Sequence, residues 1–129
     1  MPFALGARSL ARLEGVHPDL VKVVQLAIRK SDLDFAVLEG RRTVDRQRQL
    51  FGQGATKTMN SRHLTGHAVD LAALDEAGRV TWARPAYEAL ASQMKTAAAA
   101  EGVPVEWGGD WRSFFDGPHF QLPWSAYPA

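Results

Sequence analysis

Cysteine is absent from this chain of 129 residues, and histidine occurs only four times. The absence of cysteine excludes disulfide bonds and thiolate metal sites, so any bound metal ion must be held by histidine or carboxylate side chains. That set of ligands is more typical of catalytic than of structural zinc.

A dominant charge and a long apolar segment are also missing. Lys and Arg number 15 against 14 Asp and Glu, which gives a formal net charge of +1, unlike the basic surface of a nucleic-acid-binding protein. No segment has the length and hydrophobicity of a transmembrane helix. The N-terminal stretch MPFALGARSLARLEG contains arginines and no long apolar core, so it is not a signal peptide. We expect no nucleic-acid partner, no membrane insertion and synthesis in the cytoplasm.

The order of the elements indicates an α+β domain. Because helical and strand patterns do not alternate strictly, we expect a small, mainly antiparallel sheet with flanking helices. Pro18 is expected at the start of one helix and Thr43 as the N-cap of another. The predicted helices cover residues 17–31, 43–54 and 84–102, and the predicted strands cover 34–40, 67–74, 103–107 and 119–122, with a turn or hairpin over 75–82.

Two histidines and an aspartate lie in SRHLTGHAVDLAAL, residues 61–74. Ionisable groups beside a buried strand cost free energy unless they are paired, and a metal ion is one such partner. A continuous helix would separate His63 and Asp70 by about 10.5 Å along its axis, and a continuous strand would point them to opposite faces. A turn at Gly66 would let His63 fold back over Asp70, which lies between two alanines on one strand face.

A third ligand is expected from WGGDWRSFFDGPHFQL, where His119 begins a short alternating strand. The bend at Gly117–Pro118 can bring Asp116 to the same side without making it a ligand. Three ligands, an open coordination position and a nearby carboxylate describe a catalytic zinc site with a general base. Taken alone, the spacing leaves ordinary surface histidines and turn chemistry as an equal alternative. We expect His67 to be a partly buried histidine on the opposite strand face.

The pattern S-x-H-x-x-G-x-A-x-D, followed by D-G-P-H-F, resembles the zinc signature of the D-Ala-D-Ala carboxypeptidase/dipeptidase superfamily. That superfamily shares its metal-site architecture with lysostaphin-type peptidases and the hedgehog amino-terminal domain. EGRRTVDRQ and EWGGDWRSFFDGPHF are similar to segments of phage L-alanyl-D-glutamate endopeptidases, the endolysin branch, and the similarity runs from about Leu13 to Trp124. The resemblance implies a hedgehog-like fold and one zinc ion per chain.

The resemblance also implies roles for individual residues. His63, Asp70 and His119 would bind zinc, and Asp116 would be the catalytic base. Arg42 would stabilise the negative charge on the scissile carbonyl, with Arg41 as an alternative assignment. For Arg42 the competing interpretation is a surface ion pair with Glu39 or Asp45.

Further residues are expected to support the ligands or to contact substrate. Ser61 and Gln47 belong to this group. Asp110 is expected to orient a ligand histidine and is the alternative candidate for the base. Gly108 and Gly109 would allow close approach of a peptide backbone, or would form a tight turn beside a core Trp107.

The leading interpretation is a monomeric zinc endopeptidase that cuts the L-Ala–D-Glu bond of peptidoglycan stem peptides and so lyses the bacterial wall. Residues 1–129 would form a single peptidase domain without a separate wall-binding domain, released to the wall by a separate holin. The alternatives are a D-Ala-D-Ala carboxypeptidase of the same superfamily and a non-catalytic zinc-binding module.

Overall fold

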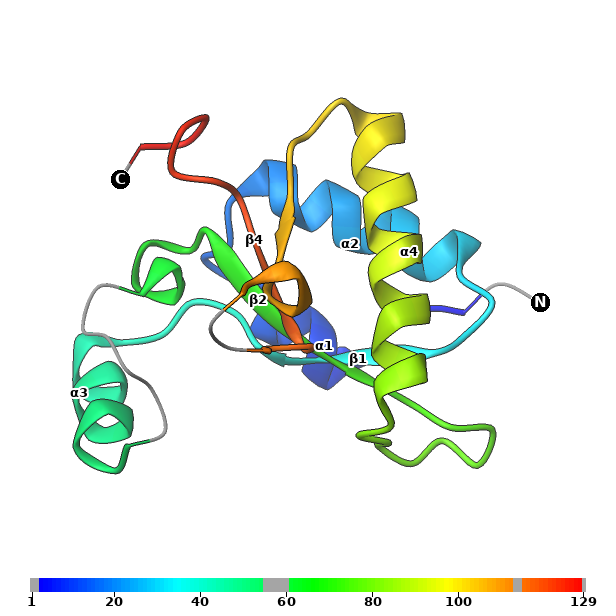
Figure 1. Ribbon diagram of the computed structural model, residues 1–129, viewed down its shortest axis with the longest axis horizontal. Helices are drawn as coiled ribbons and strands as arrows, with labels where there is room; N and C mark the ends of the chain where they lie inside the picture. The colour runs from blue at the N-terminus through cyan, green and yellow to red at the C-terminus, as the bar shows by residue number, and fades with distance from the viewer. Residues whose placement is uncertain (1–2, 55–60, 113–114, 129) are drawn as a thin grey trace.

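A four-stranded antiparallel sheet with the strand order β1-β2-β4-β3 lies at the centre of the protein (Figure 1). The computed structural model describes residues 3–54, 61–112 and 115–128. The strands are β1 (Phe35–Glu39), β2 (Ala68–Ala73), β3 (Glu106–Trp107) and β4 (His119–Gln121). The helices are α1 (Ala7–Arg12), α2 (Pro18–Lys30), α3 (Val44–Gly52) and α4 (Arg84–Glu101), and the 3-10 turns of the described residues are η1 (Arg62–Thr65) and η2 (Gly108–Asp110). The predicted α+β class is confirmed.

The helix ends follow the local signals of the sequence. Pro18 begins α2, and the ring of His17 accepts a hydrogen bond from the Asp19 backbone N–H. The Thr43 hydroxyl caps α3 by accepting a hydrogen bond from the Arg46 backbone N–H at 3.0 Å, as predicted. Gly102 ends α4 with a φ of 67°, a left-handed conformation that glycine adopts without steric cost. Among the described residues no helix is long and apolar enough to cross a membrane.

The two faces of the sheet have different roles because side chains alternate along each strand. Val69 and Leu71 of β2 join Val37, Phe120 and Trp107 in the hydrophobic core, to which α2 and α4 also contribute. The other face carries a row of polar side chains across three strands. Cα pairing places Glu39 of β1 opposite Asp70 of β2, and Asp70 opposite His119 of β4. The predicted alternation along β2 is therefore confirmed.

The helix α1 was not predicted from the sequence, and it covers the outer edge of β1. The Val37 backbone N–H donates to the Ser9 hydroxyl at 3.0 Å, and the Arg12 guanidinium donates to the Val37 carbonyl at 2.9 Å. These contacts satisfy the backbone groups that an edge strand leaves unpaired. Because α1 has only six residues, its stability depends on these tertiary contacts rather than on a strong local helical pattern.

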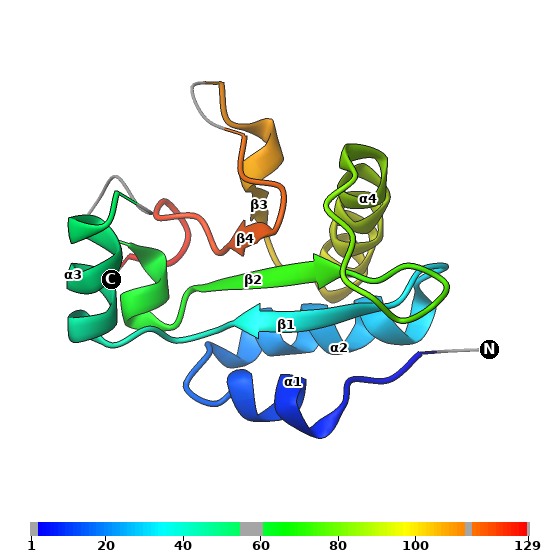
Figure 2. The same ribbon diagram turned by 90° about the horizontal axis from the view of Figure 1, so that it is seen from below.

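The polar face of the sheet lies next to α3 and η1. Figure 2 shows both at the end of the sheet where β1 finishes and β2 begins. The backbone N–H of Arg42, just before α3, donates to the carbonyl of His63 in η1 at 2.9 Å. The segments that carry Arg42 and His63 are thus held side by side.

Candidate metal centre and active site

The 3-10 turn η1 brings His63 over the sheet. The Ser61 hydroxyl caps this turn by accepting a hydrogen bond from the His63 backbone N–H at 3.2 Å. Gly66 ends it with a φ of 77°, and a Cβ at this position would lie 2.2 Å from the Gly15 carbonyl oxygen. The predicted turn at Gly66 is therefore confirmed, and both the left-handed backbone and the close packing require glycine there.

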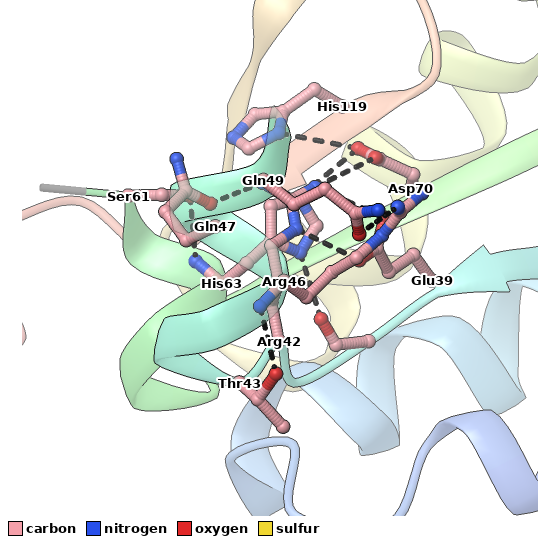
Figure 3. A network of polar contacts seen from close by, with 11 residues as sticks. Glu39, Arg42, Thr43, Arg46, Gln47, Gln49, Ser61, His63, Asp70 and His119 are labelled. Carbon is pink, nitrogen blue, oxygen red and sulfur yellow. Dashed lines mark hydrogen bonds and ion pairs between the residues drawn. The ribbon is translucent and has the colours of Figure 1, made fainter. Parts of the chain in front are cut away.

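His63, Asp70 and His119 come together on the polar face of the sheet (Figure 3). Asp70 Oδ1 lies 3.2 Å from His63 Nε2 and 3.3 Å from His119 Nδ1. The three candidate ligand atoms lie within 4.8 Å of one another, and in the described part of the chain this is the one such group of His, Asp and Glu residues. The structure thus brings together the three residues that the sequence pattern selected.

Neighbouring acceptors determine which ring nitrogens are available to a metal ion. His63 Nδ1 donates to the Gly40 carbonyl at 2.8 Å, and because a carbonyl can only accept, the neutral ring carries its proton on Nδ1 and its lone pair on Nε2. His119 Nε2 lies 2.8 Å from Gln121 Oε1. The Gln121 amide is oriented in turn by donating to Glu106 at 3.3 Å. In the neutral form of each ring, the nitrogen that faces Asp70 is therefore the one whose lone pair can bind a metal ion.

This donor set fits a zinc ion. Two neutral imidazole nitrogens and one carboxylate oxygen are ligands that zinc accepts, and three protein ligands leave a further position for water or substrate. Hydrogen bonds from the distal ring nitrogens to a carbonyl or an amide are the usual support of metal-bound histidines. His63 and His119 are buried, with exposed fractions of 2% and 6%, so their rings are held in place by packing.

The electrostatics of the metal-free cluster favour an ionised aspartate beside a protonated histidine. Burial alone would raise the pKa of Asp70, but hydrogen bonds from His119 and His63 outweigh it and hold this pKa far below its usual range. Burial alone would lower the pKa of His119, but its hydrogen bond to Asp70 and the aspartate's charge outweigh burial and raise this pKa. A cation that replaced the proton would meet the same negative charge.

Asp116 lies beside the three ligands and is not one of them. Its backbone N–H donates to the Gly108 carbonyl at 3.1 Å, and its carbonyl accepts from the His119 backbone N–H at 3.2 Å, which forms the predicted bend. Burial raises the pKa of the Asp116 carboxyl, and the nearby charge of Asp70 raises it further. A carboxylate with a raised pKa near a metal site has the properties required of a general base.

Arg42 lies at the cluster, whereas Arg41 is exposed. Arg42 Nη2 lies 3.8 Å from Asp70 Oδ2, and its side chain is 8% exposed. Its partner is Glu39, one of the two carboxylates considered from the sequence, but the pair is partly buried rather than on the surface. Asp45, the other one, lies 3.8 Å from Arg48 instead.

Gln47 contacts the site through Arg42, whereas Asp110 pairs with a residue outside the site. Gln47 is fully buried and accepts a hydrogen bond from Arg42 Nη1 at 2.6 Å. The prediction that Asp110 orients a ligand histidine is wrong. The distal ring nitrogens of both histidines bind elsewhere, and Asp110 forms an exposed ion pair with Lys95 at 2.7 Å.

The two glycines before Asp110 allow close approach within the protein itself. A Cβ at Gly108 would lie 2.4 Å from the Asp116 carbonyl oxygen and 3.1 Å from His119 Cβ. A Cβ at Gly109 would lie 2.2 Å from the ring of Trp107, which is buried in the core as expected. These glycines therefore form a tight turn, the second of the two structures that the sequence allows, and they let the loop bearing Asp116 pack against η2.

Four residues of the site were not identified from the sequence. Gln121 and His119 are two positions apart and therefore share a strand face, a signal that was present in the sequence. Glu106, Gly40 and Glu39 reach the site only through strand pairing and the chain path. All three lie in the segments EGRRTVDRQ and EWGGDWRSFFDGPHF that carry the family resemblance, but apart from the pairing of Glu39 with Arg42 no role could be assigned to them from the sequence.

Comparison with known proteins gives consistent similarities. A family model described as phage L-alanyl-D-glutamate peptidase matches residues 1–122. The L-alanyl-D-glutamate peptidase of Escherichia phage T5 is 30% identical, over 95% of this chain and 99% of that protein. The peptidoglycan L-alanyl-D-glutamate endopeptidase CwlK of Bacillus subtilis is 29% identical, over 83% of this chain and 73% of that protein. The crystal structure of the Serratia marcescens L-Ala D-Glu endopeptidase ChiX superposes with a TM-score of 0.93 at 48% identity, covering 99% and 96% of the two chains.

Proposed function

This chain belongs to the phage L-alanyl-D-glutamate peptidase family, and from that membership we propose that it is a zinc endopeptidase that cuts the L-Ala–D-Glu bond of peptidoglycan stem peptides. The observation that carries the proposal is the convergence of His63, Asp70 and His119, with each histidine turning towards Asp70 the ring nitrogen opposite the one that donates to a carbonyl or amide oxygen. Asp116 and Arg42 lie next to this group, and a purely structural metal site would need neither.

Each residue has a distinct task in the proposed mechanism. His63 Nε2, His119 Nδ1 and Asp70 would hold the ion, which would lower the pKa of a bound water and polarise the scissile carbonyl. Asp116 accepts the proton as the water attacks the amide carbon, and then passes it to the leaving amine. The Arg42 guanidinium stabilises the negative charge that develops on the carbonyl oxygen, a contribution of about 3–4 kcal/mol for a well-aimed donor.

The position of the cut distinguishes this function from that of a D-Ala-D-Ala carboxypeptidase. Mass spectrometry of purified peptidoglycan digested with the zinc-loaded protein should show stem peptides that begin with D-Glu, with L-Ala left on the sugar. Release of free D-Ala with the L-Ala–D-Glu bond intact would support the carboxypeptidase. Zinc binding without any hydrolysis would support the non-catalytic module.

Three further properties stay predictions. We expect one zinc ion per chain, a monomer in solution, and access to the cell wall through a separate holin. The first can be measured by elemental analysis and the second by light scattering. The third requires co-expression with and without a holin, with cell lysis as the readout.

A further inference from the structure

The strand β1 contains an irregularity immediately before the active site. Phe35, Ala36 and Val37 pair regularly with β2, but the register shifts between Val37 and Glu39, so that Glu39 pairs with Asp70. Leu38 is the extra residue, and it is exposed at 36%. Without the shift, Glu39 would pair with Val69 and point into the hydrophobic core, because a slip of one residue exchanges the two faces of a strand. The bulge therefore turns Glu39 towards the metal-binding face.

On that face Glu39 binds the guanidinium of Arg42 through two parallel hydrogen bonds (Figure 3). Arg42 Nε donates to Glu39 Oε1 at 2.8 Å, and Arg42 Nη2 donates to Glu39 Oε2 at 3.0 Å. Such a two-point pair fixes the plane of the guanidinium as well as its position. Arg42 Nη1 donates to Gln47 at 2.6 Å, so each of the three guanidinium nitrogens has a side-chain acceptor.

The orientation that results directs Arg42 at one oxygen of Asp70. Arg42 Nη2 lies 3.8 Å from Asp70 Oδ2, whereas the two histidines lie near Oδ1. The two oxygens of the aspartate thus face different partners, one the metal-binding histidines and the other the arginine. An unconstrained arginine side chain would lose this arrangement, because its long stem has many rotamers.

We propose that Glu39 is a positioning residue of the active site, which holds the Arg42 guanidinium against the metal-binding face with Nη2 towards Asp70. This inference rests on the proposed role of Arg42 in catalysis. Glu39 is next to Asp70 through strand pairing, but its carboxylate binds Arg42, and it acts through Arg42. The bulge in β1 turns Glu39 to the metal-binding face, and the ion pair of Glu39 with Arg42 then orients the guanidinium there.

The test is a double-mutant cycle between Glu39→Gln and Arg42→Ala, measured as kcat and KM on a defined stem peptide. Glutamine keeps the size of the side chain but offers the Arg42 guanidinium one acceptor oxygen instead of two. We expect Glu39→Gln to lower kcat roughly ten- to a hundredfold with little change in KM, the cost of a misplaced catalytic group. In the Arg42→Ala background the same substitution should have almost no further effect. Asp45→Asn, which removes the exposed carboxylate beside Arg48, is the matched control and should leave kcat unchanged.

A second readout needs neither metal nor substrate. In the metal-free protein the Arg42 Nε–H should give a 1H-15N signal that exchanges slowly with water and is identified by its loss in Arg42→Lys. In Glu39→Gln that signal should exchange faster, while the melting temperature stays close to that of the wild type.

The outcomes separate the two levels of the proposal. The role of Glu39 is overturned if Glu39→Gln lowers kcat equally in the wild type and in Arg42→Ala. It is also overturned if the exchange rate of the Arg42 Nε–H with water is the same in Glu39→Gln as in the wild type. A loss in Arg42→Ala with normal activity in Glu39→Gln overturns only this inference. Full activity in Arg42→Ala contradicts the proposed role of Arg42 and the inference with it.

Discussion

The protons on the ring nitrogens of His63 and His119 determine what the polar face of the sheet can bind. Each distal nitrogen donates to a fixed acceptor, the Gly40 carbonyl or the Gln121 amide oxygen. When the ring is neutral, each proximal nitrogen consequently carries a lone pair beside Asp70. The acceptors thus select the neutral tautomer that a metal ion requires.

Metal affinity should therefore depend on pH through His119. The pKa of this histidine is raised in the metal-free protein, because the hydrogen bond and charge of Asp70 outweigh the effect of burial. Zinc must displace that proton, so affinity should fall by about tenfold per pH unit once the pH lies below the raised pKa. Because the pKa of Asp70 is lowered, the aspartate stays ionised and adds no such dependence in this range. Competition titrations with a chromophoric chelator between pH 5 and pH 8 would measure the slope, and a flat profile would contradict the assignment.

Asp116→Asn should keep the metal and the fold but lose most of the hydrolysis. An amide cannot accept the proton of the attacking water, and loss of a general base costs about 100- to 10,000-fold in rate. The measurement is kcat on a defined stem peptide together with the zinc content of the variant. Near-normal activity in a zinc-loaded sample would transfer the role of base to another group.

Among the secondary-structure elements, α1 shows how a short helix can support the site without supplying a metal ligand. It satisfies the backbone of β1 at Val37 through Ser9 and Arg12. It also packs against the chain at Gly40, where a Cβ would lie 2.1 Å from the Arg12 carbonyl oxygen. The carbonyl of Gly40 is the acceptor that orients His63, so α1 supports a ligand through one intermediate residue.

Ser9→Ala should lower the free energy of unfolding by about 1–3 kcal/mol, because it leaves the buried Val37 N–H without an acceptor. Denaturation with urea would measure the change. Ser92→Ala is a suitable control, since Ser92 lies exposed on α4 and alanine there should change stability by less than about 0.5 kcal/mol. A loss no greater for Ser9 than for Ser92 would show that α1 does not protect the edge of the sheet.

The sequence predicts the elements with strong local signals and misses what depends on pairing between strands. Pro18 and Thr43 mark helix starts, and the alternation around Asp70 indicates which strand face it occupies; the structure confirms all three. The bulge that turns Glu39 towards the site has no local signature, because only the register with β2 defines it. The misassignment of Asp110 has a similar cause, since its ion pair with Lys95 depends on where α4 packs.

At the scale of the whole molecule, the C-terminal segment closes over the start of α2 and over η1. The Tyr127 hydroxyl donates to Asp19 at 2.7 Å, across 108 residues of sequence. Arg62, immediately before His63, donates to the carbonyls of Leu122 and Tyr127. Its guanidinium carbon Cζ lies 4.0 Å from the ring centroid of Trp124. The end of the chain is thus tied to the turn that carries a metal ligand.

Tyr127→Phe should reduce stability at neutral pH and have less effect in acid. The hydrogen bond from Tyr127 is the largest cause of the lowered pKa of Asp19. A carboxyl whose pKa is lower in the folded state stabilises the fold above its unfolded pKa, and this contribution is lost as the pH falls through the folded value. The difference in unfolding free energy should be below about 1 kcal/mol at pH 7, because the pair is partly exposed, and should shrink below about pH 4. A difference that grows in acid would contradict the pairing.

The most direct test of the metal centre is the zinc content of purified protein, measured by elemental analysis for the wild type, His119→Ala and His67→Ala. The wild type should contain one zinc ion per chain. His119→Ala should lose it, and His67→Ala should keep it, because the ring of His67 lies beside His17 and Tyr127 rather than beside Asp70. Equal zinc in the wild type and His119→Ala, or loss of zinc in His67→Ala alone, would contradict the assignment of His63, Asp70 and His119 as the metal ligands.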